Sequence, residues 1–340
     1  MDVNEKFNLI KRNTEEIIGE EELKEVLKNK KKPVVYLGTA VTGKPHIGYL
    51  LWAVKMTDFL KSGFTVKVLL ADIHGALDNC PWPLLEKRYE YYTKVISGMF
   101  HSLGFDTGIE FIRGSEFQLK KDYMFDVLRM STFVSVHDAT KAASEVVKMG
   151  DNPKLGGIIY PLLQALDEQY LDADVQYGGV DQRKIMVLAR ENLPKLGYKP
   201  RVEVMTPIIP GLIGKKMSAS IEESKIDLLE SKDSIEKKMS KAYCPEGVVE
   251  ENGVLSFLKY VVMVVKGDKG EEFVIERPEK FGGTVKFKTY EEVEAAFAAK
   301  KLHPMDLKKA LVNEIDKLVA PIRDSMKNDS KLISDAYPAK

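Results

Sequence analysis

Residues 34–49 read VVYLGTAVTGKPHIGY. The first four residues are apolar, which predicts a short buried strand. A loop that contains Gly38, Gly43 and Pro45 follows, and an amphipathic pattern then predicts a helix over about residues 46–61. A strand, a glycine-containing loop and a helix are the first half of a nucleotide-binding unit. The sequence therefore predicts that this loop holds a nucleotide.

The alternation of strands and helices continues along the chain. Apolar runs predict further strands at residues 66–71, 109–112 and 175–179. Periodic stretches predict helices at residues 7–27, 84–103, 119–133 and 137–148. Pro161 is expected to open a helix over 162–171, and Asp181 to be the N-cap of a helix that ends near residue 193. This order predicts an α/β fold with a Rossmann-like, doubly wound parallel sheet covered on both faces.

The composition changes near residue 211. Residues 211–224 are rich in glycine, lysine and serine and show little periodicity, which predicts a mobile surface loop. A mainly α-helical tail is predicted beyond it, with helices at about residues 233–243, 255–265, 290–299 and 304–323. A chain of 340 residues exceeds the usual size of one hydrophobic core. We therefore expect a Rossmann-like domain over residues 1–225 and a helical domain over 226–340.

The residue totals exclude several classes of protein. Lys and Arg number 51 and so do Asp and Glu, so the net charge gives no argument for nucleic-acid binding. Cys80 and Cys244 lie far apart, and neither a disulfide framework nor a zinc site is readable. The charged start MDVNEK lacks the apolar run of a signal peptide, and no apolar stretch has the length of a membrane span. We expect a cytoplasmic protein in a reducing compartment.

Residues 38–44, GTAVTGK, match the spacing of a phosphate-binding P-loop. The match ends at Pro45, which stands where a Ser or Thr hydroxyl would bind magnesium. Pro45 also removes one backbone donor from the helix start that would face a phosphate. A P-loop NTPase is therefore kept only as a remote alternative.

Residues 44–49, KPHIGY, favour a different phosphate chemistry. His46 is expected at a helix N-terminus, where the helix dipole favours anions, and Gly48 leaves room for a flat ring. Taken alone, His46 is equally typical of a capping or core histidine. A second motif, GKKMSAS at residues 214–220, offers Lys216, Ser218 and Ser220 to a charge that develops in a transition state. The two motifs together favour ATP chemistry.

Polar residues also mark two predicted elements near this loop. Tyr160, Gln164 and Asp167 share one helix face, and their apolar neighbours indicate that the face is partly enclosed. A solvent-facing stripe is the alternative. Gly179 and Asp181 follow a strand at its carboxyl end, where open sheets bind ligands. Asp181 is expected to accept from ribose hydroxyls, or to act as an N-cap.

The stretches HIGY (46–49) and KMSAS (216–220) resemble the paired HIGH and KMSKS signatures of class I aminoacyl-tRNA synthetases. Tyr49 replaces the second histidine and Ala219 replaces the second lysine, for which Lys215 or Lys44 could substitute. The resemblance covers nearly the whole chain and is to archaeal and eukaryotic tyrosyl-tRNA synthetases. The stretches that carry it are YLGTA (36–40), LLADIH (69–74), YPLLQALD (160–167), GGVDQRK (178–184), RPEKFGG (277–283) and HPMDLK (303–308).

This resemblance implies a tyrosine–tRNA ligase. Such an enzyme activates L-tyrosine with ATP, releases pyrophosphate and transfers the tyrosyl group to the 3′ end of tRNA. The resemblance places the tyrosine phenol between Tyr36 and Asp167. The other implied tyrosine-binding residues are Ala71, His74, Tyr160, Gln164 and Gln182.

The resemblance also implies residues for ATP, catalysis and tRNA. The ATP-binding residues are Gly38, Thr39, His46, Gly48, Gly179, Asp181, Lys216, Met217 and Ser218. The catalytic residues are His46, Gly48, Lys216, Ser218 and Ser220. Magnesium is expected to accompany ATP without a protein metal site. The residues expected to contact tRNA are Arg183, Phe281 and Asp306, with packing as the alternative for Phe281.

A homodimer that uses residues 119–150 is also expected, because members of this family dimerise through the catalytic domain. The nearest alternative is a tryptophanyl-tRNA synthetase, which shares the fold and both signatures. A third is a non-catalytic relative that serves as an RNA-binding or signalling module. Tyr36, Asp167 and Lys216 are all present, which argues against that third alternative.

Overall fold

A six-stranded sheet forms the centre of the computed structural model, which describes residues 1–147, 149–211 and 225–338. Its strands are β1 (Glu16–Ile18), β2 (Val34–Ala40), β3 (Thr65–Ala71), β4 (Ile109–Arg113), β5 (Val175–Gly179) and β6 (Val202–Thr206). Their spatial order is β1-β6-β5-β2-β3-β4. All neighbouring strands run parallel except β1, which pairs antiparallel with β6. The mainly parallel sheet predicted from the sequence is confirmed.

The order of the strands locates the ligand-binding edge. From β2 the chain moves outward through β3 to β4, and it then returns to β5 on the other side of β2. The strand order therefore reverses between β2 and β5. Open sheets of this kind bind ligands outside the carboxyl ends of the strands at such a reversal. These ends are Gly38 to Ala40 of β2 and Gly178 to Gly179 of β5.

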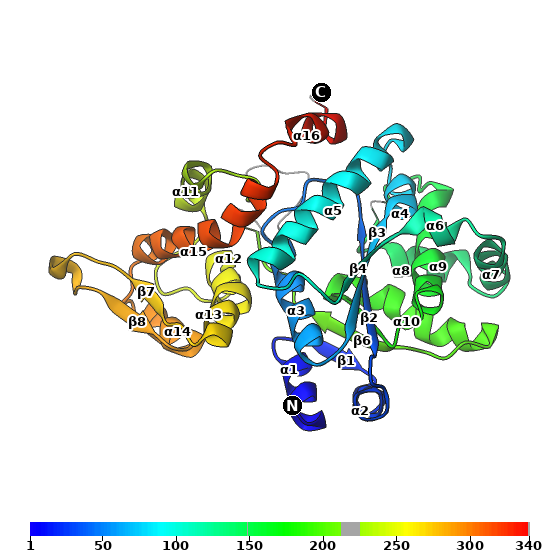
Figure 1. Cartoon of the computed structure of the whole chain (residues 1–340), viewed down its shortest axis with the longest axis horizontal. Helices are drawn as coiled ribbons and strands as arrows, with labels where there is room; N and C mark the ends of the chain where they lie inside the picture. Colours follow the sequence, from blue (N-terminus) through cyan, green and yellow to red (C-terminus); the bar gives the residue numbers. More distant parts are fainter. Residues whose placement is uncertain (148, 212–224, 339–340) are drawn as a thin grey trace.

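Helices cover both faces of the sheet (Figure 1). Helices α3 (Tyr49–Lys61) and α5 (Leu85–Ser102) lie on one face, and α8 (Val136–Ala143), α9 (Leu155–Tyr170) and α10 (Arg183–Asn192) lie on the other. Successive side chains of a strand point to opposite faces. Accordingly, Val35 and Leu37 join the core beneath α3 and α5, whereas Tyr36 joins the core beneath α9. Tyr36 is thereby directed toward the helix that carries Asp167.

Short elements connect the layers. They are α4 (Asp72–Leu77), η1 (Trp82–Leu84), α6 (Gly114–Gln118), α7 (Lys121–Ser131), η2 (Val180–Gln182) and η3 (Leu193–Leu196). The prediction that Asp181 is an N-cap is wrong, because Asp181 lies inside η2 and Gln182 is the N-cap of α10. The prediction that Pro161 opens its helix is also wrong, because α9 begins at Leu155 and Pro161 lies within it.

The N-terminal region differs from its prediction. The single helix expected over residues 7–27 is replaced by α1 (Val3–Lys11), strand β1 and α2 (Glu20–Asn29). Asn13 and Gly19 adopt positive φ values of 56° and 96°, which interrupt helical geometry. Between them, Glu16 to Ile18 pairs with β6 and becomes the edge of the sheet. The apolar residues of segment 7–27 therefore belong to two helices and a strand, and not to one continuous helix.

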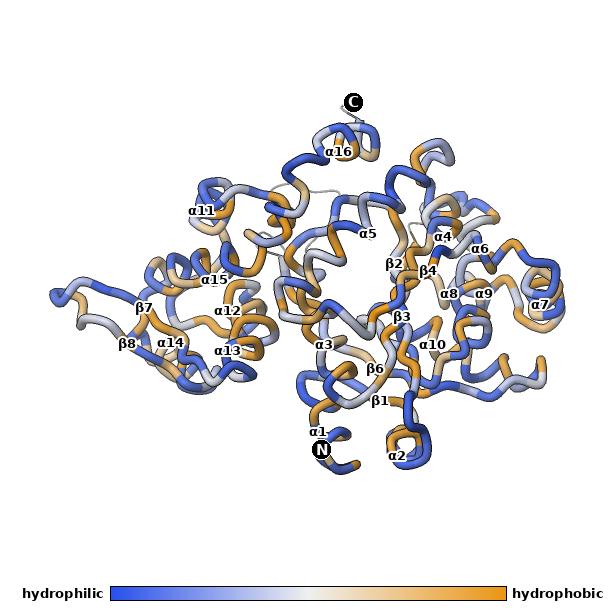
Figure 2. Tube along the Cα trace, in the orientation of Figure 1, coloured by the Kyte–Doolittle hydropathy of each residue, from blue (hydrophilic) through white to orange (hydrophobic). Residues whose placement is uncertain are grey.

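The tail beyond residue 225 is mainly helical. Its helical elements are α11 (Lys232–Lys241), α12 (Gly253–Phe257), the π-helical η5 (Leu258–Val262), α13 (Met263–Lys269), η6 (Glu279–Phe281), α14 (Tyr290–Ala298), α15 (Pro304–Ser325) and α16 (Ser330–Ala336). Strands β7 (Phe273–Ile275) and β8 (Val285–Phe287) form a small antiparallel sheet where no strands were predicted. The loop that joins them is hydrophilic (Figure 2).

The tail shares a core with the rest of the chain. Phe257 and Ile315 of the tail belong to the same buried cluster as Val35 and Phe59. Helices α15 and α16 both pack against α5. Within the described ranges, no helix combines the length and the apolar character that a membrane crossing requires.

Candidate active site at the carboxyl edge of the sheet

Two adjoining cavities lie at the carboxyl ends of β2 and β5, where the strand order reverses. The inner cavity has a volume of about 330 Å³ and extends to Tyr36 and Asp167. The outer cavity has a volume of about 300 Å³ and extends to His46 and Ile208. The residues that line both are Gly38, Thr39, Tyr49, Gln164, Asp181 and Gln182. The site can therefore hold two small molecules in contact with each other.

Asp167 is the most unusual group of the inner cavity. Its carboxyl is buried, and its Oδ1 accepts hydrogen bonds of 2.8 Å from Gln118 Nε2 and Tyr123 Oη. Its Oδ2 has no hydrogen-bond partner, and the Nε2 atom of His74 lies 3.8 Å from it, also without one. Burial raises the pKa of Asp167 to about 8, although the bonds from Gln118 and Tyr123 oppose the rise. An unpaired buried oxygen is costly, so Oδ2 is suited to a ligand hydroxyl.

Tyr36 is the second buried polar group in this cavity. Its hydroxyl donates to the backbone oxygen of Gln164 over 3.3 Å. Burial raises the pKa of Tyr36 well above its usual value, so the phenol keeps its proton and can donate. The pKa of His74 is lowered to about 4 by burial, which leaves its imidazole neutral.

The seven residues implied for tyrosine binding all line the inner cavity. Gln164 donates to Gln182 Oε1 over 3.0 Å, and the ring of Tyr160 meets that of His74 edge-on with centroids 4.5 Å apart. Helix α9 presents Tyr160, Gln164 and Asp167 on one face, as the spacing predicts. The complete set is Tyr36, Ala71, His74, Tyr160, Gln164, Asp167 and Gln182. The solvent-facing alternative for this stripe is wrong, because Tyr160 and Asp167 are buried.

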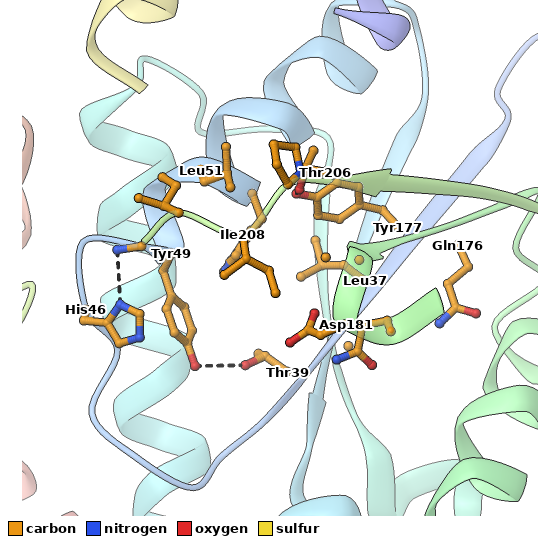
Figure 3. Close-up of a pocket in the computed structure, with 18 of the residues that line it drawn as sticks. Leu37, Thr39, His46, Tyr49, Leu51, Gln176, Tyr177, Asp181, Thr206 and Ile208 are labelled. Carbon is orange, nitrogen blue, oxygen red and sulfur yellow. Dashed lines mark hydrogen bonds between the residues drawn. The ribbon is translucent and has the colours of Figure 1, made fainter. Parts of the chain in front are cut away.

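The outer cavity collects the described residues implied for ATP binding. They are Gly38, Thr39, His46, Gly48, Gly179 and Asp181, of which Thr39, His46 and Asp181 are labelled in Figure 3. Apolar walls from Leu37, Trp52 and Ile208 complete it and can contact the faces of a flat ring. A Cβ atom at Gly179 would lie 2.6 Å from Asp181 Oδ1, so glycine allows η2 to turn back toward the cavity.

His46 is held in one protonation state. Its Nδ1 accepts a hydrogen bond of 3.2 Å from the backbone N–H of Gly48 (Figure 3), so the ring proton lies on Nε2. Burial and the nearby Lys225 lower the pKa of His46 to about 4. The residue is therefore a neutral donor at physiological pH. The P-loop alternative loses support, because α3 begins only at Tyr49, five positions after Lys44.

Three polar residues of the site were not anticipated as contributors. Gln118 lies at the end of α6 and Tyr123 in α7, and both reach Asp167 only through the fold. No local pattern in the sequence marks either of them. Tyr49 lines both cavities, and its position in the HIGY motif was a signal that could have identified it.

Six of the expected residues are not among the described residues that line the two cavities. Lys215, Lys216, Met217, Ser218 and Ser220 fall outside the described residues. The Nζ atom of Lys44 lies 5.7 Å from the ring centre of Tyr337, and Lys44 lines neither cavity.

The three residues expected to contact tRNA are likewise separate from both cavities. Arg183 pairs with Glu16 over 2.6 Å and lines a surface groove between α8 and α10. Phe281 is 60% exposed at the end of η6, and Asp306 lies in the first turn of α15. Within the described ranges, no group of three or more His, Cys, Asp or Glu side chains could hold a metal ion.

Comparison with known proteins agrees with this geometry. A family model described as "tRNA synthetases class I (W and Y)" matches residues 28–320. The chain is 50% identical to the cytoplasmic tyrosine–tRNA ligase of Danio rerio, over 98% of this chain and 63% of that protein. It is 45% identical to the tyrosine–tRNA ligase of Natronomonas pharaonis, over 100% and 99% of the two chains.

A solved structure extends the agreement to three dimensions. The tyrosyl-tRNA synthetase of Archaeoglobus fulgidus, complexed with L-tyrosine, superimposes with a TM-score of 0.90 at 40% identity, over 96% of this chain and 100% of that one. The chain spans 63% of the length of the Danio rerio relative. The tryptophanyl alternative is not supported, because these relatives are named for tyrosine. The chain belongs to the class I tRNA synthetases of the tryptophan and tyrosine group, and within that group to the tyrosyl-tRNA synthetases.

Proposed function

We propose that this chain activates L-tyrosine with ATP and transfers the tyrosyl group to tRNA. The observation that carries the proposal is the unpaired Oδ2 of buried Asp167, in a cavity that Tyr36 also lines and that adjoins a second cavity. Relatives with this function in their names, and a relative solved with L-tyrosine, support it.

In the inner cavity, the tyrosine phenol accepts a hydrogen bond from Tyr36 and donates one to Asp167 Oδ2. Asp167 Oδ2 is buried without a hydrogen-bond partner and can therefore reject phenylalanine, which would leave it unpaired at a cost of about 1–3 kcal/mol. The substrate's amino group then lies near Tyr160, Gln164 and Gln182, at the border of the outer cavity. This orientation directs the substrate carboxylate toward the nucleotide.

ATP occupies the outer cavity in this proposal. His46 donates from Nε2 to the phosphates, Asp181 accepts from the ribose, and the apolar walls contact adenine. Gly38, Thr39, Gly48 and Gly179 allow close approach of the nucleotide. Lys216, Met217, Ser218 and Ser220 are proposed to grip the phosphates, because the signature implies it. Magnesium enters with the triphosphate, as a part of the substrate.

The reaction needs no covalent protein intermediate. An oxygen of the tyrosine carboxylate attacks the α-phosphorus of ATP, and the bond to the β-phosphate oxygen breaks. Pyrophosphate leaves with the bonding electron pair, and no proton has to move. The protein contributes by holding the two reactants together and by stabilising charge on the phosphates. A ribose hydroxyl at the 3′ end of tRNA then attacks the activated carbonyl carbon and forms an ester bond. The bond from that carbon to the phosphate oxygen breaks, AMP leaves with the electron pair, and the hydroxyl proton is released to the AMP phosphate or to solvent.

For tRNA, we propose two contact regions. The groove between α8 and α10 gathers the cations Lys141, Arg183, Lys184 and Lys195, which suit a phosphate backbone. In the tail, exposed Phe281 can stack on an unpaired base and Asp306 can accept from one. The tail beyond residue 225 is thus proposed as the anticodon-binding domain.

We also propose a homodimer that forms through α7 and its flanks. The exposed apolar side chains of this region are Leu119, Met124, Phe125, Leu128 and Val136. They lie within the segment 119–150 expected to form the interface, at the edge of the molecule farthest from the tail (Figure 1). The cytoplasm is the proposed location, as for the relative from Danio rerio.

The decisive experiment is pyrophosphate exchange into ATP with the purified chain. Exchange is expected with tyrosine and not with tryptophan or phenylalanine. Exchange driven by tryptophan would contradict the tyrosine assignment, and ATP hydrolysis without an amino acid would restore the NTPase alternative. Absence of exchange with every amino acid would favour the non-catalytic alternative. Tyr36→Phe and Asp167→Ala should weaken tyrosine selection more than ATP use.

A further inference from the structure

A row of polar side chains crosses the sheet beneath α9. In the strand register, Tyr36 of β2 is opposite Gln176 of β5, and Gln176 is opposite Glu203 of β6. Side chains in register point to the same face of a sheet, and Tyr36 belongs to the core beneath α9. Gln176 and Glu203 therefore point toward α9, the helix that carries Asp167 and Glu168. The row thus extends from the proposed tyrosine pocket to a buried acid two strands away.

Five oxygen atoms beneath α9 are buried and accept no hydrogen bond from the residues that the structure describes. They are both carboxyl oxygens of Glu168, both carboxyl oxygens of Glu203, and Oε1 of Gln176. Glu168 and Glu203 are 0% exposed, and Gln176 is 2% exposed. A buried acceptor without a donor costs free energy, so this cluster needs at least one hydrogen atom that it can share.

Two arginines lie near the cluster, but their hydrogen bonds go to other groups. Arg190 of α10 donates to the backbone oxygen of Arg201, and to Glu22 of α2 over 3.1 Å. Arg201, which precedes β6, donates to Gln169 Oε1 over 2.7 Å. The two arginines therefore supply positive charge near the cluster but no donor to it. A proton on one of the two carboxyls is the donor that remains.

The charges around Glu168 and Glu203 favour a single proton. Burial raises the pKa of both carboxyls well above the usual value, although the two arginines oppose the rise. Loss of both protons would place two negative charges in one buried cluster, whereas two bound protons would remove the charge that attracts the arginines. The charged and titratable groups on the surrounding elements are Asp167 on α9, Tyr36 on β2, Lys67 on β3, Arg190 on α10, Arg201 before β6 and Glu22 on α2.

We propose that Glu168 and Glu203 share one proton at neutral pH and act together as positioning residues that hold α9 over β6 beside the tyrosine pocket. The positioning role rests on the proposed function. The shared proton supplies the missing donor and joins the helix of Asp167 to a strand of the sheet. Because Asp167 directly precedes Glu168, a movement of Glu168 displaces the carboxyl that is proposed to bind the substrate phenol.

Urea unfolding without substrates tests the shared proton. The unfolded chain ionises both carboxyls above about pH 5, whereas the folded chain keeps one proton, so folding takes up a proton. Glu203→Gln has a permanent N–H donor in place of that proton and needs no uptake. Between about pH 5.5 and pH 7.5, the folding equilibrium constant of wild type relative to Glu203→Gln should fall about tenfold per pH unit. A ratio that does not depend on pH would overturn the proposal.

Three further variants make this measurement specific. Glu168→Gln should differ from wild type in the same way, because either carboxyl can hold the shared proton. The double variant with both substitutions should also differ by about tenfold per pH unit, and a hundredfold difference would overturn sharing, because each carboxyl would then hold its own proton. Glu110→Gln is the matched control, since exposed Glu110 of β4 is opposite Lys67 at the far end of the same row. Its ratio to wild type should not depend on pH.

Tyrosine binding tests the positioning role. Glu203→Met removes the partner of the buried Glu168 carboxyl and should weaken tyrosine binding about tenfold in equilibrium dialysis, while ATP affinity stays within about threefold. Glu203→Gln should restore tyrosine affinity to within about threefold of wild type, because its amide replaces the donor. Glu168→Met leaves Glu203 unpaired in the same way and gives a second measurement if Glu203→Met does not fold. Methionine variants that bind tyrosine as well as wild type, or a glutamine variant as weak as methionine, would overturn the positioning role.

The outcomes distinguish this inference from the proposed function. A wild-type chain that does not bind tyrosine contradicts the proposed function, whereas the unfolding measurements need no substrate and test the shared proton alone. A wild-type chain that binds tyrosine but shows the same pH dependence of folding as Glu203→Gln contradicts only this inference.

Discussion

The carboxyl of Asp167 explains why a single residue can select the substrate. Two donors bind its Oδ1 and none binds its Oδ2, although the whole group is buried. A structural carboxylate is normally paired on both oxygens, because an unpaired buried acceptor costs free energy. That cost is offset when a ligand hydroxyl binds. The resemblance identified Tyr36 and Asp167, but Gln118 and Tyr123 come from distant segments and required the fold.

Tyrosine binding should depend on pH through Asp167. Its pKa is raised to about 8 by burial, so the free site holds a proton below that pH. A substrate phenol that donates to Oδ2 favours the ionised form, so binding must release the proton. Affinity for tyrosine should therefore rise up to tenfold per pH unit toward pH 8 and level off above it. Equilibrium dialysis between pH 6 and pH 9 measures this, and Asp167→Asn should abolish the slope.

A pH-independent affinity in wild type would show that Asp167 does not change its protonation on binding. Phenylalanine provides an internal control, because it lacks the hydroxyl. The affinity for phenylalanine should fall toward pH 8 or stay constant, because phenylalanine gives the ionised carboxylate of Asp167 no hydrogen-bond donor.

Tyr123→Phe tests how Asp167 is held. The hydroxyl of Tyr123 donates to Asp167 Oδ1, and it also lies 2.7 Å from the backbone oxygen of Leu163. Loss of this donor leaves Asp167 Oδ1 with one hydrogen bond fewer, at a free-energy cost of about 1 kcal/mol or more. Selection of tyrosine over phenylalanine in pyrophosphate exchange should fall by roughly tenfold, because 1.4 kcal/mol corresponds to that factor.

Tyr170→Phe is the control for that substitution. Tyr170 packs edge-on against Tyr123, with centroids 4.8 Å apart, but its hydroxyl bonds to Asp126 and not to Asp167. It should leave selection unchanged. If both variants lose selection equally, the effect comes from packing of the aromatic pair.

At the scale of elements, the sequence was most informative where one pattern was long and local. Strands β2, β3 and β5 and helices α3 and α5 all lie close to their predicted positions. Strand β1 was missed because three residues carry no periodic signal, and its pairing depends on β6, almost 190 positions later. The start of α9 was predicted wrongly at Pro161, because proline is typical of the first turn of a helix. In the structure Pro161 lies in the interior of α9.

The turn that creates β1 gives a prediction about stability. Gly19 has φ of 96°, and a Cβ atom there would lie 3.0 Å from Glu22 Oε2. Gly19→Ala should therefore lower the free energy of unfolding by about 1 kcal/mol. Gly267→Ala in α13 is the matched control, because its added Cβ meets no atom of the described residues within 4 Å beyond its chain neighbours and the backbone of its own helix. Alanine should stabilise that helix by roughly 0.5 kcal/mol.

Urea unfolding followed by circular dichroism measures both changes. The two substitutions are chemically identical and should shift the midpoint in opposite directions. Equal shifts would mean that the backbone conformation at Gly19 has no influence on the stability of the N-terminal edge.

At the scale of the whole molecule, the tail is joined to the sheet by both packing and charge. Asp268 of α13 bonds to Arg12, which follows α1, and to Lys61 of α3, each over 2.6 Å. Arg12 also pairs with buried Asp58. Helix α3 begins at the site residues Gly48 and Tyr49, so the same helix contacts the reaction site and the tail. Such an arrangement was not readable from the sequence, because each partner comes from a different region.

The proposed dimer predicts how the whole molecule sediments. Phe125 and Leu128 are 60% and 63% exposed on α7, where an apolar patch is costly unless a partner covers it. Aromatic residues at the centre of an interface often contribute about 2 kcal/mol or more. Phe125→Asp should therefore shift the sedimentation coefficient from that of a dimer to that of a monomer. Met305→Asp, a 50% exposed apolar residue in the tail, should leave it unchanged. A wild-type chain that sediments as a monomer, or a Phe125→Asp chain that remains dimeric, would show that α7 is not the interface.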